Sequence, residues 1–138
     1  TQLDFSSAPA PSSPTNINIS EVVAKPGVVI AAVTSNLILY GVYRSTDNGT
    51  SWTRVLTNPT IASVENLNGG TVFLASGTDQ IFRSTDDGLT WTGYPTSQSN
   101  SIQRVLSCTP ASAGSITRIL GAGVNGTLLH SLNGGRGG

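Results

Sequence analysis

The stretch YRSTDNGTSW at residues 43–52 recurs 39 residues later as FRSTDDGLTW at residues 82–91. Serine, aspartate, glycine and tryptophan hold the same places in both copies: Ser45, Asp47, Gly49 and Trp52, then Ser84, Asp86, Gly88 and Trp91. A weaker third copy, LLHSLNGGRGG at residues 128–138, has Ser131, Asn133 and Gly135 in the serine, aspartate and glycine places. Ser131 follows Ser84 by 47 residues, and a repeated unit of about 40 residues with about four strands is typical of a propeller blade.

Each copy is interpreted as a strand, a tight turn and a returning strand. The first strand ends at Ser45, the turn contains Asp47 and Gly49, and Trp52 opens the return strand. An aspartate carboxylate can accept backbone N–H groups inside such a turn, and glycine adopts a backbone conformation that other residues avoid. The tryptophan then packs a large apolar area against neighbouring strands. We therefore expect the turn aspartates to be structural and both tryptophans to be packed.

The pattern Ser-x-Asp-x-Gly-x-(Ser/Thr)-Trp resembles the Asp-box, or BNR, repeat of sialidases, sortilin-type receptors and photosystem assembly factors. The resemblance covers most of residues 17–138. It implies a β-propeller whose boxes lie at the periphery, at the turn between the third and fourth strands of each blade. It also implies a structural role for Asp47 and Asp86.

The rest of the chain favours an all-β fold of antiparallel four-stranded blade repeats, propeller-like, with about three blades. Its apolar segments are short, rich in β-branched residues and bounded by Gly, Asn, Ser or Pro. We expect an extended N-terminal arm at residues 1–15 and an Asp-box repeat domain at 16–138, with blades at about 17–57, 60–95 and 102–138. The last blade is expected to be incomplete, because the printed sequence stops at the place of its box tryptophan.

Three blades are fewer than the four to eight that typically close a propeller. The chain could be a fragment of a longer protein, a stack or sandwich that uses the box without a propeller, or one subunit of a larger ring. We favour assembly, because an open arc would leave apolar faces and strand edges uncovered. The arm, with QLDFSS at residues 2–7, is expected to add a strand to an incomplete blade, in the same chain or in a neighbouring one.

Composition points to a polar but weakly charged surface. Only 10% of the 138 residues are charged, and seven Lys and Arg balance seven Asp and Glu. Such surfaces are common on virion, extracellular and cell-surface proteins, and the absence of a basic patch argues against a nucleic-acid partner. The apolar run around residues 28–43 is interrupted by Thr34, Ser35 and Asn36, so no membrane span is expected. Cys108 is the only cysteine, which excludes a disulfide within the chain.

Catalytic chemistry is not expected. The likeness to sialidases implies three substrate-binding arginines, a Tyr–Glu pair, an Asp acid/base and a Phe-Arg-Ile-Pro motif. That motif is absent, Arg44 and Arg83 occupy equivalent places in the repeats, and neither Glu21 nor Glu65 has a nearby Tyr in the sequence. The single His130 and Cys108 do not form a zinc site, and the turns lack the acids of a calcium loop, so no metal or cofactor is expected.

These observations predict a non-enzymatic structural or assembly protein of a virion or cell surface, for example a phage decoration or tail-associated protein. Its expected partners are further copies of itself or other structural subunits. One alternative is a carbohydrate- or protein-binding propeller module, for which Tyr94, placed in the polar loop TGYPTSQSNS, is a weak candidate contact. A third possibility is a fragment of a sialidase-like glycoside hydrolase.

Overall fold

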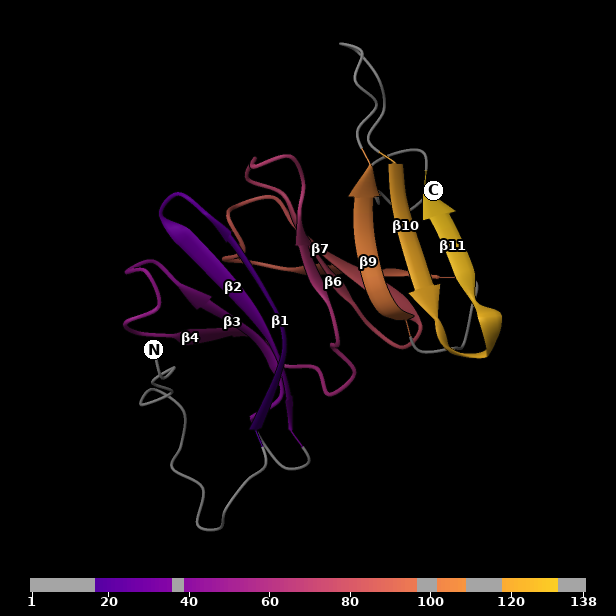
Figure 1. Ribbon diagram of the computed structural model, residues 1–138, viewed down its shortest axis with the longest axis horizontal. Helices are drawn as coiled ribbons and strands as arrows, with labels where there is room; N and C mark the ends of the chain where they lie inside the picture. The colour runs from indigo at the N-terminus through magenta and orange to yellow at the C-terminus, as the bar shows by residue number, and fades with distance from the viewer. Residues whose placement is uncertain (1–16, 36–38, 97–101, 109–117, 132–138) are drawn as a thin grey trace.

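The computed structural model describes residues 17–35, 39–96, 102–108 and 118–131. Within these residues it contains three antiparallel sheets that follow one another in chain order (Figure 1). The first sheet consists of β1 (Ile17–Lys25), β2 (Val28–Ser35), β3 (Gly41–Ser45) and β4 (Thr53–Leu56). The second consists of β5 (Val64–Asn66), β6 (Phe73–Ser76), β7 (Gln80–Ser84) and β8 (Thr92–Pro95). The third consists of β9 (Ile102–Cys108), β10 (Arg118–Gly123) and β11 (Leu128–Ser131), with a short 3-10 turn, η1 (Val124–Gly126), between the last two.

Every sheet is a meander in which each strand pairs with the next strand along the chain. This arrangement confirms the expected all-β class of antiparallel, blade-like sheets with almost no helix. The third sheet has three strands in the described part of the chain. The expectation that its blade lacks a last strand concerns residues 132–138, and the expected arm lies at 1–15; both lie outside the described residues.

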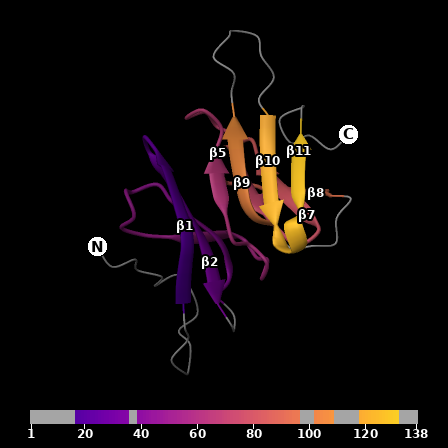
Figure 2. The same cartoon turned by 45° about the vertical axis from the view of Figure 1, so that its right-hand side comes forward.

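The first strands of successive sheets lie next to one another, and the later strands extend away from them. Strand β5 contacts β1 on one side and β9 on the other. Figure 2 shows β1, β5 and β9 following each other across the molecule. Each sheet thus joins its neighbours through its first strand, as blades do around a propeller axis.

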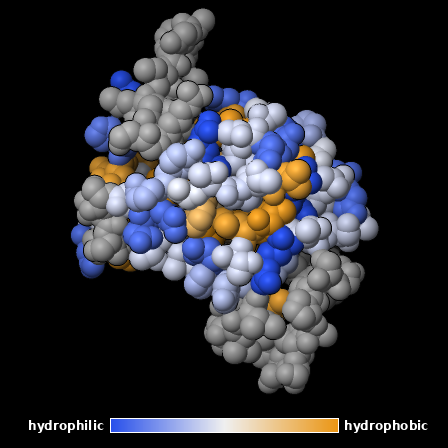
Figure 3. Space-filling view, turned by 180° about the vertical axis from the view of Figure 1, so that it is seen from behind, coloured by the Kyte–Doolittle hydropathy of each residue, from blue (hydrophilic) through white to orange (hydrophobic). Residues whose placement is uncertain are grey.

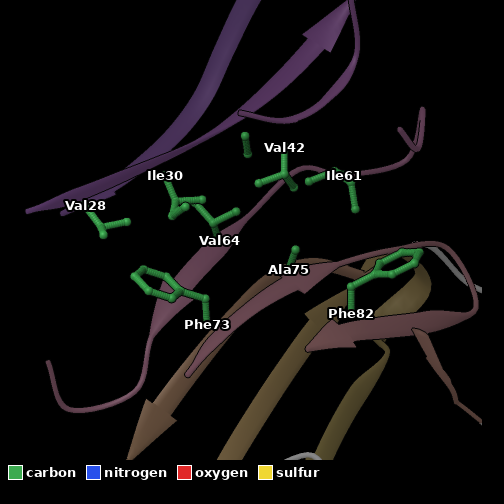
Figure 4. Packing of buried hydrophobic residues seen from close by; sticks show 9 residues of the cluster. Val28, Ile30, Val42, Ile61, Val64, Phe73, Ala75 and Phe82 are labelled. Carbon is green, nitrogen blue, oxygen red and sulfur yellow. The ribbon is translucent and has the colours of Figure 1, made fainter. Parts of the chain in front are cut away.

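A core of apolar side chains fills the space between the first and second sheets (Figure 4). Alternate residues of a strand point to opposite faces, so Val28, Ile30 and Ala32 of β2 all face the second sheet. From the second sheet, Val64 of β5 and Phe73 of β6 pack against them. The cluster as a whole contains Val28, Ile30, Ala32, Val42, Ile61, Val64, Phe73, Ala75 and Phe82.

A second core joins the second and third sheets. Its buried members are Leu67, Leu74, Ile102, Val105 and Ile119. Leu74 belongs to β6, whose neighbours in the strand, Phe73 and Ala75, face the first sheet. Strand β6 is therefore buried on both faces, which explains its continuous apolar sequence FLAS. In the described ranges, no helix is long and apolar enough to cross a membrane.

Candidate functional site

The first repeated turn connects β3 to β4 and is closed by its own side chains. The hydroxyl of Ser45 donates to Asp47 Oδ1 at 2.7 Å and accepts the N–H of Gly49 at 2.8 Å. Asp47 then accepts the Ser51 N–H on Oδ1 at 2.9 Å and the Ser51 hydroxyl on Oδ2 at 2.6 Å. The indole Nε1 of Trp52 donates to the carbonyl of Gly49 at 3.0 Å. Serine, aspartate, glycine and tryptophan therefore form one hydrogen-bonded unit.

The second turn connects β7 to β8 and repeats this network atom for atom. Ser84 donates to Asp86 Oδ1 at 2.7 Å and accepts the Gly88 N–H at 2.9 Å. Asp86 accepts the Thr90 N–H at 2.9 Å and the Thr90 hydroxyl at 2.6 Å. Trp91 Nε1 donates to the Gly88 carbonyl at 3.0 Å. Both turns join the third strand of a sheet to its fourth, which is where the Asp-box resemblance placed them.

The backbone of the turns explains why glycine and a small polar residue stand side by side. Gly49 and Gly88 have φ values of 87° and 76°, and the preceding Asn48 and Asp87 have φ values of 58° and 60°. Asparagine and aspartate tolerate this left-handed region better than other side chains, and glycine enters it without a steric penalty. The sequences DNG and DDG are thus the local cause of the turn.

The hydrogen bonds of the turns also act on the acidity of the two aspartates. The Ser51 hydroxyl, the Ser51 N–H and the Ser45 hydroxyl lower the pKa of Asp47 to about 2. The Thr90 hydroxyl and N–H do the same to Asp86, whose pKa is also lowered to about 2. All these donors stabilise the charged carboxylate. Each aspartate is therefore an ionised acceptor inside its own turn, a role that suits structure rather than proton transfer.

The second turn also joins its sheet to the first sheet, through Asp87. The Nε of Arg44, on β3, donates to the Asp87 carbonyl at 2.7 Å. Lys25, at the end of β1, forms an ion pair with the Asp87 carboxylate and a hydrogen bond to the Gly70 carbonyl. Gly88 faces Ile30 so closely that a Cβ placed on this glycine would approach Ile30 Cδ1 to 2.5 Å. The second turn therefore connects the first and second sheets as well as strands β7 and β8.

A polar junction connects the inner strands of all three sheets around Glu21. A β-bulge between Ile19 and Glu21 changes the register of β1 at this point. Glu21 Oε2 accepts the Ser63 hydroxyl at 2.6 Å and the Val64 N–H at 3.0 Å, while Oε1 pairs with Arg104 of β9 at 2.8 Å. The Ser63 hydroxyl also accepts the N–H of Val105 at 3.1 Å. Both oxygens of Glu21 are thus engaged in linking strands.

The remaining candidate residues are spread over the molecule. Ser131 ends β11, while Asn133 and Gly135 of the third copy lie outside the described residues. Tyr94 lies in β8, opposite Ile81, and is half-buried, so its expected place in a polar loop is wrong. The strand continues through TGYP because β8 pairs with β7 as far as Pro95. His130 is exposed at the place that Arg44 and Arg83 hold in the first two copies.

Sequence reasoning missed both sets of contacts between sheets. The Glu21 junction joins residues that are 42 and 43 positions apart, and no local pattern marks such a contact. The Arg44–Asp87 contact did leave a signal, because an arginine precedes the box serine in both full copies. Within the described part of the chain, no group of three or more His, Cys, Asp or Glu side chains is placed to hold a metal ion.

Comparisons with known proteins support the architecture. No family model matches the chain, and no curated protein matches it. Among solved structures, an ancestral GH74 enzyme is similar with a TM-score of 0.63 and 24% sequence identity. The match covers 85% of this chain and 17% of that enzyme chain. GH74 enzymes are β-propeller glycoside hydrolases, so this likeness supports a propeller-type arrangement of the three sheets.

Proposed function

We propose that this chain is a non-enzymatic assembly module, an arc of Asp-box blades whose two end sheets pack against blades of neighbouring subunits. Its proposed setting is the surface of a virion or of a cell. The weakly charged, hydroxyl- and amide-rich sequence supports that setting. The observation that carries the proposal is the exposure of Leu128 on the third sheet.

Leu128 occupies a position that is covered in the two preceding sheets. Counting back from the box serine, Val42, Ile81 and Leu128 are equivalent. Val42 is fully buried in the core between the first and second sheets, and Ile81 packs against the core between the second and third. Leu128 is 73% exposed. The third sheet therefore exposes an apolar side chain at the position where each earlier sheet packs against the following sheet.

The first sheet carries an apolar cluster of its own at the other end of the arc. In the second sheet, Phe82 and Trp91 face the preceding sheet. Their equivalents, Tyr43 and Trp52, form an apolar cluster with Ala31 and Val33, and all members of this cluster come from the first sheet and its own turn. Tyr43 and Trp52 are only 1% and 3% exposed, so this cluster is already buried within the chain, and the exposed side of the proposed contact is the one at Leu128.

The molecular surface supports an interaction role as well. On the face seen in Figure 3, a band of hydrophobic surface (orange) crosses the middle of the molecule between hydrophilic margins. Contiguous hydrophobic surface of this kind is typical of interaction sites. In the proposed assembly, residues 1–15 contribute by adding a strand to a neighbouring blade.

The proposal is tested by placing a charge at Leu128. We expect Leu128→Glu to reduce a multimer of the chain to monomers in sedimentation equilibrium, because a carboxylate at a packed interface loses its hydration. Leu89→Glu is the matched control, because Leu89 is 57% exposed in the second turn and lies outside the proposed contact. A multimer that persists in Leu128→Glu, or one that Leu89→Glu dissociates equally well, would contradict the proposal.

The GH74 likeness favours a second candidate, namely that the three sheets are part of a glycoside hydrolase propeller. A panel of soluble polysaccharides separates the two, with new reducing ends as the readout. Release of reducing ends by the purified chain would support the hydrolase. The assembly proposal expects none.

A further inference from the structure

The side of the third sheet that faces away from the second sheet is partly apolar and carries basic side chains. Ile119 and Leu129 pack in the core shared with the second sheet, so the residues that alternate with them point to the opposite side. This outer face consists of Arg118, Leu120 and Ala122 of β10 and of Leu128 and His130 of β11. Except for the half-buried Leu120, all of these residues are exposed. The outer face is therefore accessible to a partner.

The outer face has the layout of the face of the first sheet that receives the second box turn. Arg44 and His130 each directly precede a box serine, and the residues opposite them in the neighbouring strand are Ile30 and Leu120. In the first sheet, this pair holds the turn, because Arg44 Nε donates to a turn carbonyl at 2.7 Å and Ile30 lies against the turn glycine. In the third sheet, the equivalent pair supplies an aliphatic side chain and a nitrogen donor. The third sheet therefore has the side chains to receive a box turn.

The tip of the first box turn carries groups that fit this face. Asp47 and Asn48 are exposed, and a Cβ placed on Gly49 would meet, among the described residues, only the ring of Trp52 in the same turn. Asn48 is the equivalent of Asp87, whose carbonyl and carboxylate bind the first sheet. The first turn therefore exposes the residues through which the second turn binds a sheet. It also carries the negative charge of Asp47, which is opposite in sign to the charge of the outer face.

We propose that the first box turn of a second copy docks on the outer face of the third sheet, in the way that the second turn docks on the first sheet. This inference rests on the proposed assembly function and names the two surfaces that meet. The first and third sheets lie at opposite ends of the arc (Figure 1), so the contact joins two copies. Leu120 packs against Gly49 of the docked turn, and a ring N–H of His130 donates to the carbonyl of Asn48. Arg118 faces the negative charge of the turn, and opposite charges fix the orientation of such a contact.

Giving the first turn the aspartate that the second turn carries tests this contact. Asn48→Asp is compatible with the turn, because Asp87 holds the equivalent place with a φ of 60°, close to the 58° of Asn48. We expect Asn48→Asp to lower the dissociation constant of the multimer about threefold, because it adds a carboxylate opposite Arg118. In the Arg118→Gln background, the same substitution should leave the dissociation constant unchanged, whereas Arg118→Lys should retain the gain. The measurement is sedimentation equilibrium of the 138-residue chain at low ionic strength, where charges are least screened.

Asn68→Asp is the matched control, because Asn68 is also exposed, has a φ of 55° and precedes a glycine, but lies in the turn between β5 and β6. It adds the same charge outside the proposed contact and should leave the dissociation constant unchanged. The inference is overturned if a multimer forms and Asn48→Asp has no effect, has the same effect in Arg118→Gln, or acts no differently from Asn68→Asp. A parent chain that is monomeric at every concentration overturns the assembly function itself, so the two failures are distinguishable. Circular dichroism checks that each variant has kept the fold.

Discussion

At the scale of single residues, the two turn aspartates show how an acid in this repeat can hold its own turn together. Asp47 and Asp86 each accept hydrogen bonds from two side chains and from the backbone of their own turn. Their carboxylates are ionised acceptors whose pKa lies near 2 because of these bonds. Each of these exposed carboxylates stabilises its turn through the hydrogen bonds that it accepts. Protonation of the carboxylate should therefore lower the stability of the fold.

This property leads to a prediction about acid stability. The folded-state pKa of both aspartates is about 2, below their ordinary 3.8, so the unfolded chain binds protons more readily than the folded chain. Their contribution to stability is therefore complete above a pH of about 4 and is lost as the pH falls toward about 2. We expect the melting temperature of the parent chain to fall over this range, and to fall less steeply in Asp47→Asn and Asp86→Asn. The measurement is a series of thermal melts between these pH values.

Asp79 supplies the control for this prediction, because it is exposed and lies outside both turns. Asp79→Asn should leave the pH dependence of the melting temperature as it is in the parent chain. If either turn variant kept the full acid slope, its aspartate would not be stabilised by the hydrogen bonds seen in the turn.

At the scale of strands and sheets, the two repeated turns differ in their contacts. The turn of the second sheet also packs against the first sheet. Gly88 lies against Ile30 of the first sheet, whereas a side chain at Gly49 would meet only the ring of Trp52, at an ordinary 3.6 Å. The two equivalent glycines therefore have different surroundings. Comparing the same substitution at both glycines measures what the contact between the two sheets contributes to stability.

We expect Gly88→Ala to destabilise the chain more than Gly49→Ala. Both alanines would be strained at positive φ by about 1–2 kcal/mol. Gly88→Ala would also push against Ile30 in a packed core, which adds about 1–3 kcal/mol. Urea unfolding of the two variants measures the difference in the free energy of unfolding. Equal losses would show that the second turn does not press on the first sheet.

Local patterns predicted the turns well, and long-range contacts could not be predicted from them. Ser45, Asp47 and Gly49 fall within five consecutive residues, so their chemistry can be read from the sequence. The all-β class followed from short β-branched segments in the same way. By contrast, the Glu21–Ser63 hydrogen bond depends on how two sheets pack. It also depends on a bulge in β1 that no sequence pattern marks. Tyr94 was misplaced because the pairing of β8 with β7 outweighed the loop-like composition around it.

At the scale of the whole molecule, the three sheets form an arc with two unlike ends. Inside the arc, apolar cores and the Glu21 junction join each sheet to the next. At one end, Leu128 is exposed where its equivalents are covered, and at the other end Tyr43 and Trp52 are buried in an apolar cluster of the first sheet. In the proposed assembly, contacts made through the Leu128 end join copies head to tail, and such contacts close into a ring or continue as a fibre.

The molar mass of the 138-residue chain in solution, measured by light scattering over a wide range of concentrations, tests the assembly proposal most directly. We expect a mass above that of one 14.2 kDa chain, because the exposed Leu128 marks an end that packs against another copy in the proposed assembly. A mass of one chain at every concentration would contradict the proposal that this protein works by joining copies of its own blades.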